Sequence, residues 1–118
     1  MPWKFESDRP IYAQILEQIK ERIIVREYPP GSRLPSVREL ATEAAVNPNT
    51  MQRAMAELER EGYVVTNRTT GRTVTDNVGV IMESKKSTAI ELTQKYIEKM
   101  EQLGFSKEQI VKIIEEGK

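Results

Sequence analysis

The sequence contains no cysteine and no histidine among its 118 residues. Zinc sites built from cysteine and histidine are therefore excluded. Nucleophile pairs in which a histidine activates a serine or a cysteine are excluded as well. Without cysteine there is also no disulfide framework. We expect no metal and no other cofactor.

Glycine is sparse, and its six copies are scattered along the chain. None of them fits G-x-G-x-x-G or the Walker pattern, so no glycine-rich phosphate loop is present. Glu57 and Glu61 form a carboxylate pair four residues apart, but acids at this spacing on a helix are typical of a solvated face. We therefore expect no enzymatic activity.

Long hydrophobic runs are also absent, since no stretch of eighteen apolar residues occurs. This excludes a membrane span. The opening residues, MPWKFESDRP, contain acids and a proline where a signal peptide requires an apolar run. We expect a cytoplasmic protein with one modest domain, or a small domain with an arm.

Acidic and basic side chains balance, with 18 of each and a net charge of zero. A zero net charge argues mildly against a general nucleic-acid coat protein, because such proteins are usually basic. The distribution is uneven, however, because every arginine lies between Arg9 and Arg72 and every later basic residue is lysine. Arginine suits phosphates and guanine edges better than lysine does.

The first predicted helix lies within PIYAQILEQIKERIIVREYPPG. Ile11, Ile15, Ile19 and Ile23 recur every fourth residue and form one apolar stripe of about four turns. The sequence Tyr28-Pro29-Pro30-Gly31 ends it, because proline cannot continue a helix.

Two short helices follow, and their starts are marked by capping residues. Ser36 and Glu39 form a capping box for a helix that ends near Ala44 or Ala45. Asn47 suits the cap and Pro48 the first position of the next helix, which Gly62 stops. Its apolar stripe leaves a small polar first turn on the other side.

After Gly62 the pattern changes to short β-type runs. YVVTN and GRTVT predict a β-hairpin with Arg68 to Gly71 near its tip. Residues 76–87 indicate a connection that enters a helix, and Gly104 breaks the long helix that follows. Ser106 and Gln109 form a second capping box for a short final helix.

A pair of short helices followed by a hairpin predicts a mainly α fold with a small β-hairpin. The same pattern predicts a winged helix-turn-helix domain in residues 1–75, followed by a two-helix arm in residues 76–118. The second helix of such a motif places its N-terminal residues against base edges in the major groove. The alternative at this stage is a small α/β core whose capped helices simply pack together.

Several separated motifs resemble one family. PSVRELA, then VNPNTMQRAMAELEREG, then a hairpin, resemble the N-terminal domain of the GntR family of bacterial transcription regulators. DRPIYAQILEQIKERI and YPPGSRLPSVREL match the same domain, so the resemblance covers roughly residues 8–75. NPNT and the short C-terminal part resemble the YtrA-like subfamily. That resemblance implies a two-helix tail used for dimerisation, with no large effector domain.

The resemblance also implies DNA-contacting residues. Those in the helices are Arg38, Pro48, Asn49, Thr50, Gln52 and Arg53. The wing departs from the family pattern of Gly-x-Gly followed by Thr-Phe-Val, because it reads Thr69-Thr70-Gly71-Arg72-Thr73-Val74. We therefore expect Arg68 or Arg72 to supply its contact. As alternatives, Arg38 could instead pair with Glu43 and Arg53 with Glu57.

The tail carries more apolar residues than two helices can cover by themselves, which predicts a homodimer interface. Its residues are Ala89, Leu92, Tyr96, Met100, Leu103, Phe105, Ile110, Val111, Ile113 and Ile114.

The partners implied are a second copy of the chain and a double-stranded DNA operator with inverted-repeat half-sites, and no membrane. The sequence identifies no small-molecule effector. The resemblance further implies a repressor of bacterial transporter or envelope-stress genes. The main alternative is a winged-helix module that binds protein rather than DNA. A second alternative is a domain of a larger enzyme, as in the branch of the family that is fused to an aminotransferase-like domain. That branch needs hundreds more residues and a cofactor lysine, so we do not expect it here.

Overall fold

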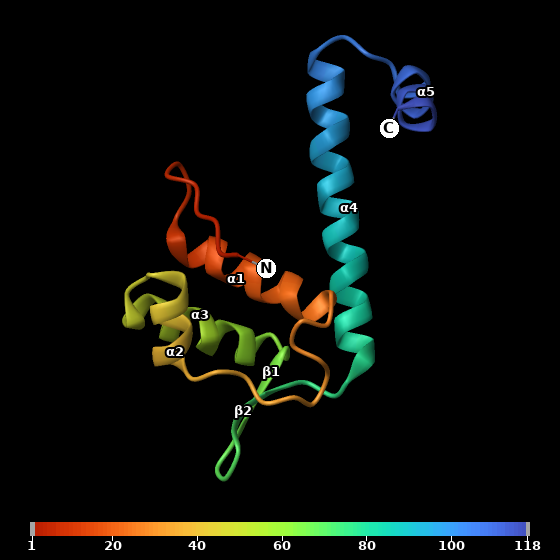
Figure 1. The fold of residues 1–118 in the computed structure, drawn as a ribbon. Helices are drawn as coiled ribbons and strands as arrows, with labels where there is room; N and C mark the ends of the chain where they lie inside the picture. The colour runs from red at the N-terminus through yellow and green to blue at the C-terminus, as the bar shows by residue number, and fades with distance from the viewer. Residues whose placement is uncertain (1, 118) are drawn as a thin grey trace. The chain divides into compact units, whose positions relative to one another are not determined.

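The fold, seen in a computed structural model that describes residues 2–117, is mainly α with one β-hairpin, as the sequence predicts (Figure 1). The chain divides into two compact units, one ending at Ser84 and the other beginning at Lys85. The elements in order are α1 (Ile11–Ile24), α2 (Val37–Ala44), α3 (Pro48–Arg60), β1 (Val64–Asn67), β2 (Gly71–Val74), α4 (Val78–Gln102) and α5 (Lys107–Glu116).

The core of the first unit forms where α3 lies against α1, α2 and β1. It is built from the apolar stripes that the periodicity predicts, because each helix turns one face toward its neighbours. Its central members are Ile15, Ile19, Ile23, Leu40, Ala41, Met51, Ala54, Met55, Leu58, Val64 and Val74. The hairpin projects from this helical core (Figure 1).

The predicted caps of α2 and α3 are present. Ser36 Oγ accepts a hydrogen bond from the Glu39 amide, and Glu39 Oε1 accepts one from the Ser36 amide, both at 3.1 Å. The hydrogen bond from the Ser36 amide is the main contact that holds the pKa of the Glu39 carboxyl below its usual range. Asn47 Oδ1 accepts from the Asn49 amide at 2.7 Å, and Pro48 occupies the first turn of α3.

The hairpin is antiparallel, with Val64 opposite Val74 and Asn67 opposite Gly71. Residues 31–34 also pair with β2, which the sequence did not indicate. The amide of Gly31 donates to the Val74 carbonyl at 3.0 Å, and the amide of Leu34 donates to the Arg72 carbonyl at 2.9 Å. The loop before α2 is thereby attached to the base of the hairpin.

Helix α4 begins at Val78, earlier than the sequence indicated. Asn77 caps it, since its Oδ1 accepts from the Gly79 amide at 3.0 Å, in the same way that Asn47 caps α3. Ile81, only 6% exposed, joins the core of the first unit. Most of the expected connection is therefore helical. No helix within residues 2–117 is long and apolar enough to cross a membrane.

The segment before α1 is attached by two glutamines of that helix. The buried amide of Gln14 donates to the carbonyls of Glu6 and Arg9 and accepts from the Glu6 amide, at distances of 2.7–2.9 Å. Gln18 exchanges a similar pair of bonds with Lys4. A side-chain amide used in this way replaces a backbone partner.

Arg22 of α1 is 1% exposed and joins this segment to α2. Its guanidinium stacks 3.9 Å from the centre of the Trp3 ring. It also lies 3.2 Å from a Glu27 carboxylate oxygen and 3.6 Å from one of Glu43. Trp3 Nε1 donates to the same Glu43 oxygen at 3.0 Å. Burial raises the pKa of the neighbouring Tyr28, and the hydrogen bond with Arg22 opposes that rise.

Candidate nucleic-acid interface

The first turn of α3 presents the polar surface that the sequence predicts. Pro48, Asn49, Gln52 and Arg53 are exposed, and Thr50 is half-buried. Met51 between them is fully buried, which fixes the rotation of the helix about its axis. The start of a helix has unpaired amides and a partial positive charge, both of which favour an anion such as phosphate.

Arg38 lies in the first turn of α2 and is exposed. Its alternative partner, Glu43, instead accepts from Trp3 and pairs with Arg22. Within residues 2–117 Arg38 forms no ion pair, so its guanidinium is available to a ligand.

Arg53 does not form the ion pair with Glu57 that was its alternative. Glu57 is held by Arg60, whose Nε donates to it at 2.8 Å, and this partner lowers the pKa of the Glu57 carboxyl to about 2. The guanidinium of Arg53 instead lies 4.7 Å from the centre of the Tyr12 ring on α1. The aromatic face restricts the arginine while its N–H groups remain free to donate.

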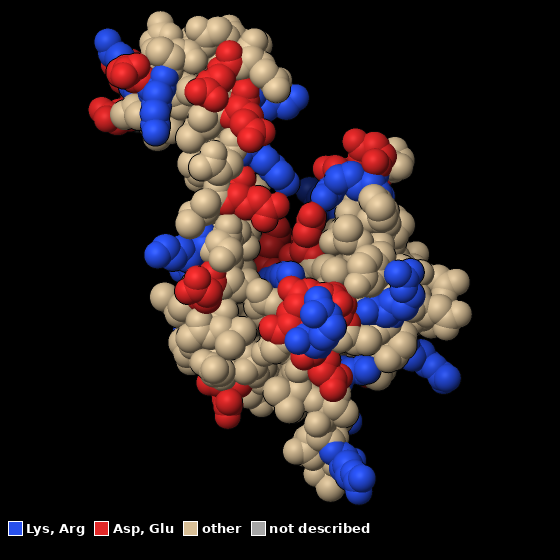
Figure 2. Space-filling model, turned by 180° about the vertical axis from the view of Figure 1, so that it is seen from behind, with Lys and Arg blue, Asp and Glu red and all other residues tan. Residues whose placement is uncertain are grey.

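The two arginines of the wing, Arg68 and Arg72, lie in different surroundings. Arg68, Thr69 and Thr70 lie in the exposed turn, and Gly71 follows with a φ of 80°, a conformation that favours glycine. Figure 2 shows basic atoms at the end of the projecting hairpin, where Arg68 lies. The side chain of Arg72 is only 24% exposed, and its Nε lies 3.7 Å from Glu59 Oε1 on α3.

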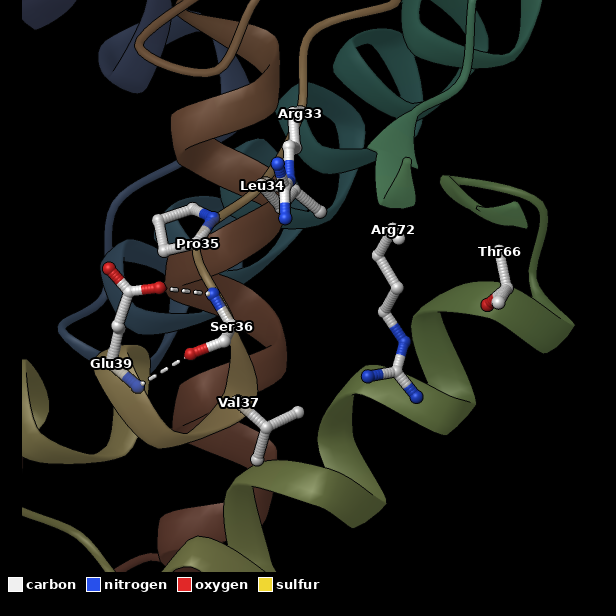
Figure 3. A pocket seen from close by; sticks show the side chains of 9 residues that line it. Arg33, Leu34, Pro35, Ser36, Val37, Glu39, Thr66 and Arg72 are labelled. Carbon is white, nitrogen blue, oxygen red and sulfur yellow. Dashed lines mark hydrogen bonds between the residues drawn. The ribbon is translucent and has the colours of Figure 1, made fainter. Parts of the chain in front are cut away.

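A pocket of about 370 Å³, which no sequence pattern predicted, lies between the start of α2 and β2 (Figure 3). Arg33, Ser36, Thr66, Gly71 and Arg72 are among the residues that line it. Arg33 lies within the motif YPPGSRLPSVREL, but no functional role was predicted for it. Its place depends on the pairing of residues 31–34 with β2, which joins segments about forty residues apart and leaves no local pattern.

The expected dimer residues lie on α4, α5 and the turn between them, and most are exposed. Leu92, Leu103 and Ile114 are more than half exposed, at 61%, 73% and 57%. Ala89, Tyr96, Phe105, Val111 and Ile113 are also exposed, and Met100 is half-buried. Ile110 differs, because it is 1% exposed within the single chain. Within residues 2–117 there is no group of three or more acidic side chains placed to hold a metal ion.

A family model described as bacterial regulatory proteins, gntR family, matches residues 11–74. The chain is 40% identical over 108 residues to the HTH-type transcriptional regulator YhcF of Bacillus subtilis (strain 168), covering 92% of this chain and 89% of that protein. It is 45% identical over 84 residues to the HTH-type transcriptional repressor YtrA of the same strain, covering 71% of this chain and 65% of YtrA.

Two solved structures extend this similarity. A GntR family transcriptional regulator from Listeria monocytogenes is 39% identical, with a TM-score of 0.89 over 97% of this chain and all of that one. The DNA-binding domain of AraR, in complex with the operator ORX1, is 25% identical, with a TM-score of 0.56 over 61% of this chain and 93% of that one.

Proposed function

The chain belongs to the gntR family of bacterial regulatory proteins and is YtrA-like, and we infer that this DNA-binding transcription regulator acts as a dimeric repressor. The observation that carries the proposal is the first turn of α3. It is capped by Asn47, fixed in rotation by the buried Met51, and exposes a row of hydrogen-bonding side chains.

Specific roles follow from this placement. Asn49, Thr50, Gln52 and Arg53 would read base edges in the major groove, with Pro48 beside them. Arg38 would contact phosphate and fix the position of α3 on the duplex. At the wing we propose contacts from Arg68, Thr69, Thr70, Gly71 and Arg72.

The regulatory role rests on the relatives. YtrA carries the name of a repressor, and the AraR domain is bound to an operator. We propose that this chain likewise represses, and that its targets are transporter or envelope-stress genes, as the subfamily resemblance implies. A regulator of bacterial genes works in the cytoplasm, and we place the protein there.

We propose that residues 1–75 bind DNA and that residues 76–118 are the dimerisation arm. The exposed apolar side chains of α4 and α5 support an interface, because large exposed apolar patches on a protein surface usually bind a partner. A two-fold partner would relate two recognition helices by symmetry. The operator would then consist of inverted half-sites spaced by about one helical turn or a multiple of it.

The DNA-reading surface is tested by alanine variants assayed on a site selected from genomic fragments. Arg38→Ala should weaken binding to every duplex. Asn49→Ala and Arg53→Ala should each cost roughly 1–3 kcal/mol of binding free energy on the selected site and relax its base preference. Arg60→Ala, at the other end of α3, is the matched control. Parent-like titrations for all three variants would exclude this surface.

A parent whose affinity for mixed DNA does not change with salt would favour the protein-binding module.

Tyr12 tests how Arg53 is positioned. Tyr12→Leu removes the ring on which the guanidinium stacks, a contact worth about 0.5–1 kcal/mol at an exposed site. The affinity for the selected site should fall roughly two- to fivefold, and base preference should relax as it does in Arg53→Ala. Tyr12→Phe keeps the ring and should behave like the parent. Equal affinities for the leucine and phenylalanine variants would show that the ring does not position Arg53.

A further inference from the structure

Two guanidinium groups line the pocket between α2 and β2, and neither donates a hydrogen bond to an acceptor in residues 2–117. Arg33 is exposed and forms no ion pair there. Arg72 Nε, 3.7 Å from Glu59, is beyond hydrogen-bonding distance of that carboxylate and has no other acceptor. A guanidinium carries five N–H donors, so most of the donor capacity in this pocket is unused.

The nearby carboxylates already have donors of their own. Glu39 Oε1 accepts from the Ser36 amide, and Glu59 Oε1 accepts from Thr66 Oγ1 at 2.6 Å. In Figure 3 the Glu39 carboxylate lies on the α2 side of the pocket, while Arg72 extends from the opposite side toward α3. Two like charges that share a pocket with unused donors favour an anionic ligand.

The positions of the two arginines are fixed by the backbone. Arg33 pairs with Thr73 in an antiparallel bridge, and the neighbouring Leu34 amide bonds to the Arg72 carbonyl. A Cβ added to Gly71 would lie 3.9 Å from Arg33 Nε, so no side chain separates Arg33 from the start of β2. The main chain that carries both arginines is therefore in place before any ligand arrives, which reduces the entropy lost on binding.

We propose that this pocket binds one phosphate of the DNA backbone. Arg33 is the principal cation, and Arg72, which is held near Glu59, is the second cation of the site. The inference rests on the proposed function and adds to it a phosphate contact that carries no sequence information. Planar guanidinium groups match the geometry of phosphate oxygens, which makes phosphate the anion best suited to this pair.

The surroundings favour a backbone phosphate over a free one. The pocket borders the first turn of α2, which carries Arg38, and the start of β2, which follows the wing turn that carries Arg68. A duplex that contacts both elements would pass a phosphate across the opening between them. Arg72 would then make its DNA contact within the pocket, at the β2 strand of the wing, and Arg68 is the cation that reaches beyond the pocket.

The test uses the full chain and three variants: Arg33→Gln, Arg33→Lys and the control Arg60→Gln. Each is titrated with mixed-sequence duplexes at several salt concentrations. Arg33→Gln should bind every duplex about tenfold more weakly, and the slope of log affinity against log salt should flatten by about 0.9, the value for one phosphate contact. Arg33→Lys should keep most of the slope, and Arg60→Gln should match the parent. Because Arg33 is exposed, the variants should share the parent's unfolding midpoint in urea.

A second arm adds inorganic phosphate without DNA and follows the Arg33 side chain by NMR. Saturation by phosphate, together with unchanged DNA affinity in Arg33→Gln, would assign the pocket to a free phosphate and overturn the proposal. If Arg33→Gln binds DNA like the parent while Arg38→Ala loses affinity, the pocket assignment fails and the proposed function stands. A parent that shows no salt-dependent DNA binding would contradict both the pocket assignment and the proposed function.

Discussion

Leu92→Glu is expected to convert the proposed dimer to a monomer and to lower the affinity of the protein for the full operator by roughly 100-fold or more. Leu92 is 61% exposed in the single chain, so the change should not disturb the fold of the monomer. In a dimer the same carboxylate would be buried without a partner, at a high energetic cost. A monomer loses the tethering that makes the second half-site contact intramolecular, and that tethering accounts for the 100-fold figure.

Sedimentation at micromolar concentration and titration with full and half operators measure the two effects. Ile113→Glu should act in the same way from α5, where that side chain is exposed. Gln94→Glu adds the same charge two residues from Leu92, off the apolar stripe, and should remain dimeric. Affinity for a half-site should be the same in all four proteins. A monomeric parent, or a Leu92→Glu variant that still sediments as a dimer, would contradict the interface.

Arg22→Ala is expected to lower the free energy of unfolding by about 3 kcal/mol, at the low end of the range for breaking a buried ion pair. The low end applies because the Glu27 and Glu43 side chains are 31% and 53% exposed and stay partly hydrated without the arginine. The variant would also lose the packing of Trp3 on the guanidinium. A small domain is stable by only about 5–15 kcal/mol, so this change is large.

Urea unfolding of the parent and three variants separates the causes. Arg22→Met fills much of the same volume and should recover roughly half of the loss, since it restores packing on Trp3 but not the charge. Glu21→Ala, an exposed neighbour on α1, should stay within about 0.5 kcal/mol of the parent. Equal stabilities for the parent and Arg22→Ala would show that the Arg22 contacts do not stabilise the fold.

The predictions from sequence succeeded where the signal was local. The caps at Ser36, Asn47 and Ser106 each depend on residues two or three positions apart, and all are present. The core helices likewise follow from apolar spacing, because burial of a face requires only a periodic pattern. The start of α4 had a local signal too, since Asn77 repeats the cap of Asn47.

Apart from the start of α4, the features that the sequence did not predict join segments far apart in the chain. Trp3 bonds to Glu43 forty residues away, and Arg33 bridges to Thr73. Arg53 stacks on Tyr12 rather than pairing with its helical neighbour Glu57. Such pairings depend on how helices and strands pack, and no short-range rule encodes them. They alter the candidate site most, because they decide which arginines remain free.

Trp3 is the only tryptophan in the sequence, and it lies against a guanidinium and a carboxylate. Intrinsic tryptophan fluorescence from this protein therefore reports one location, the junction between the N-terminal segment, α1 and α2. Because α2 carries Arg38, a change in emission during titration with operator would show that the contact between the N-terminal segment and α2 responds to DNA. The chain thus contains its own optical probe at the helix next to α3, the proposed recognition helix, without an added dye.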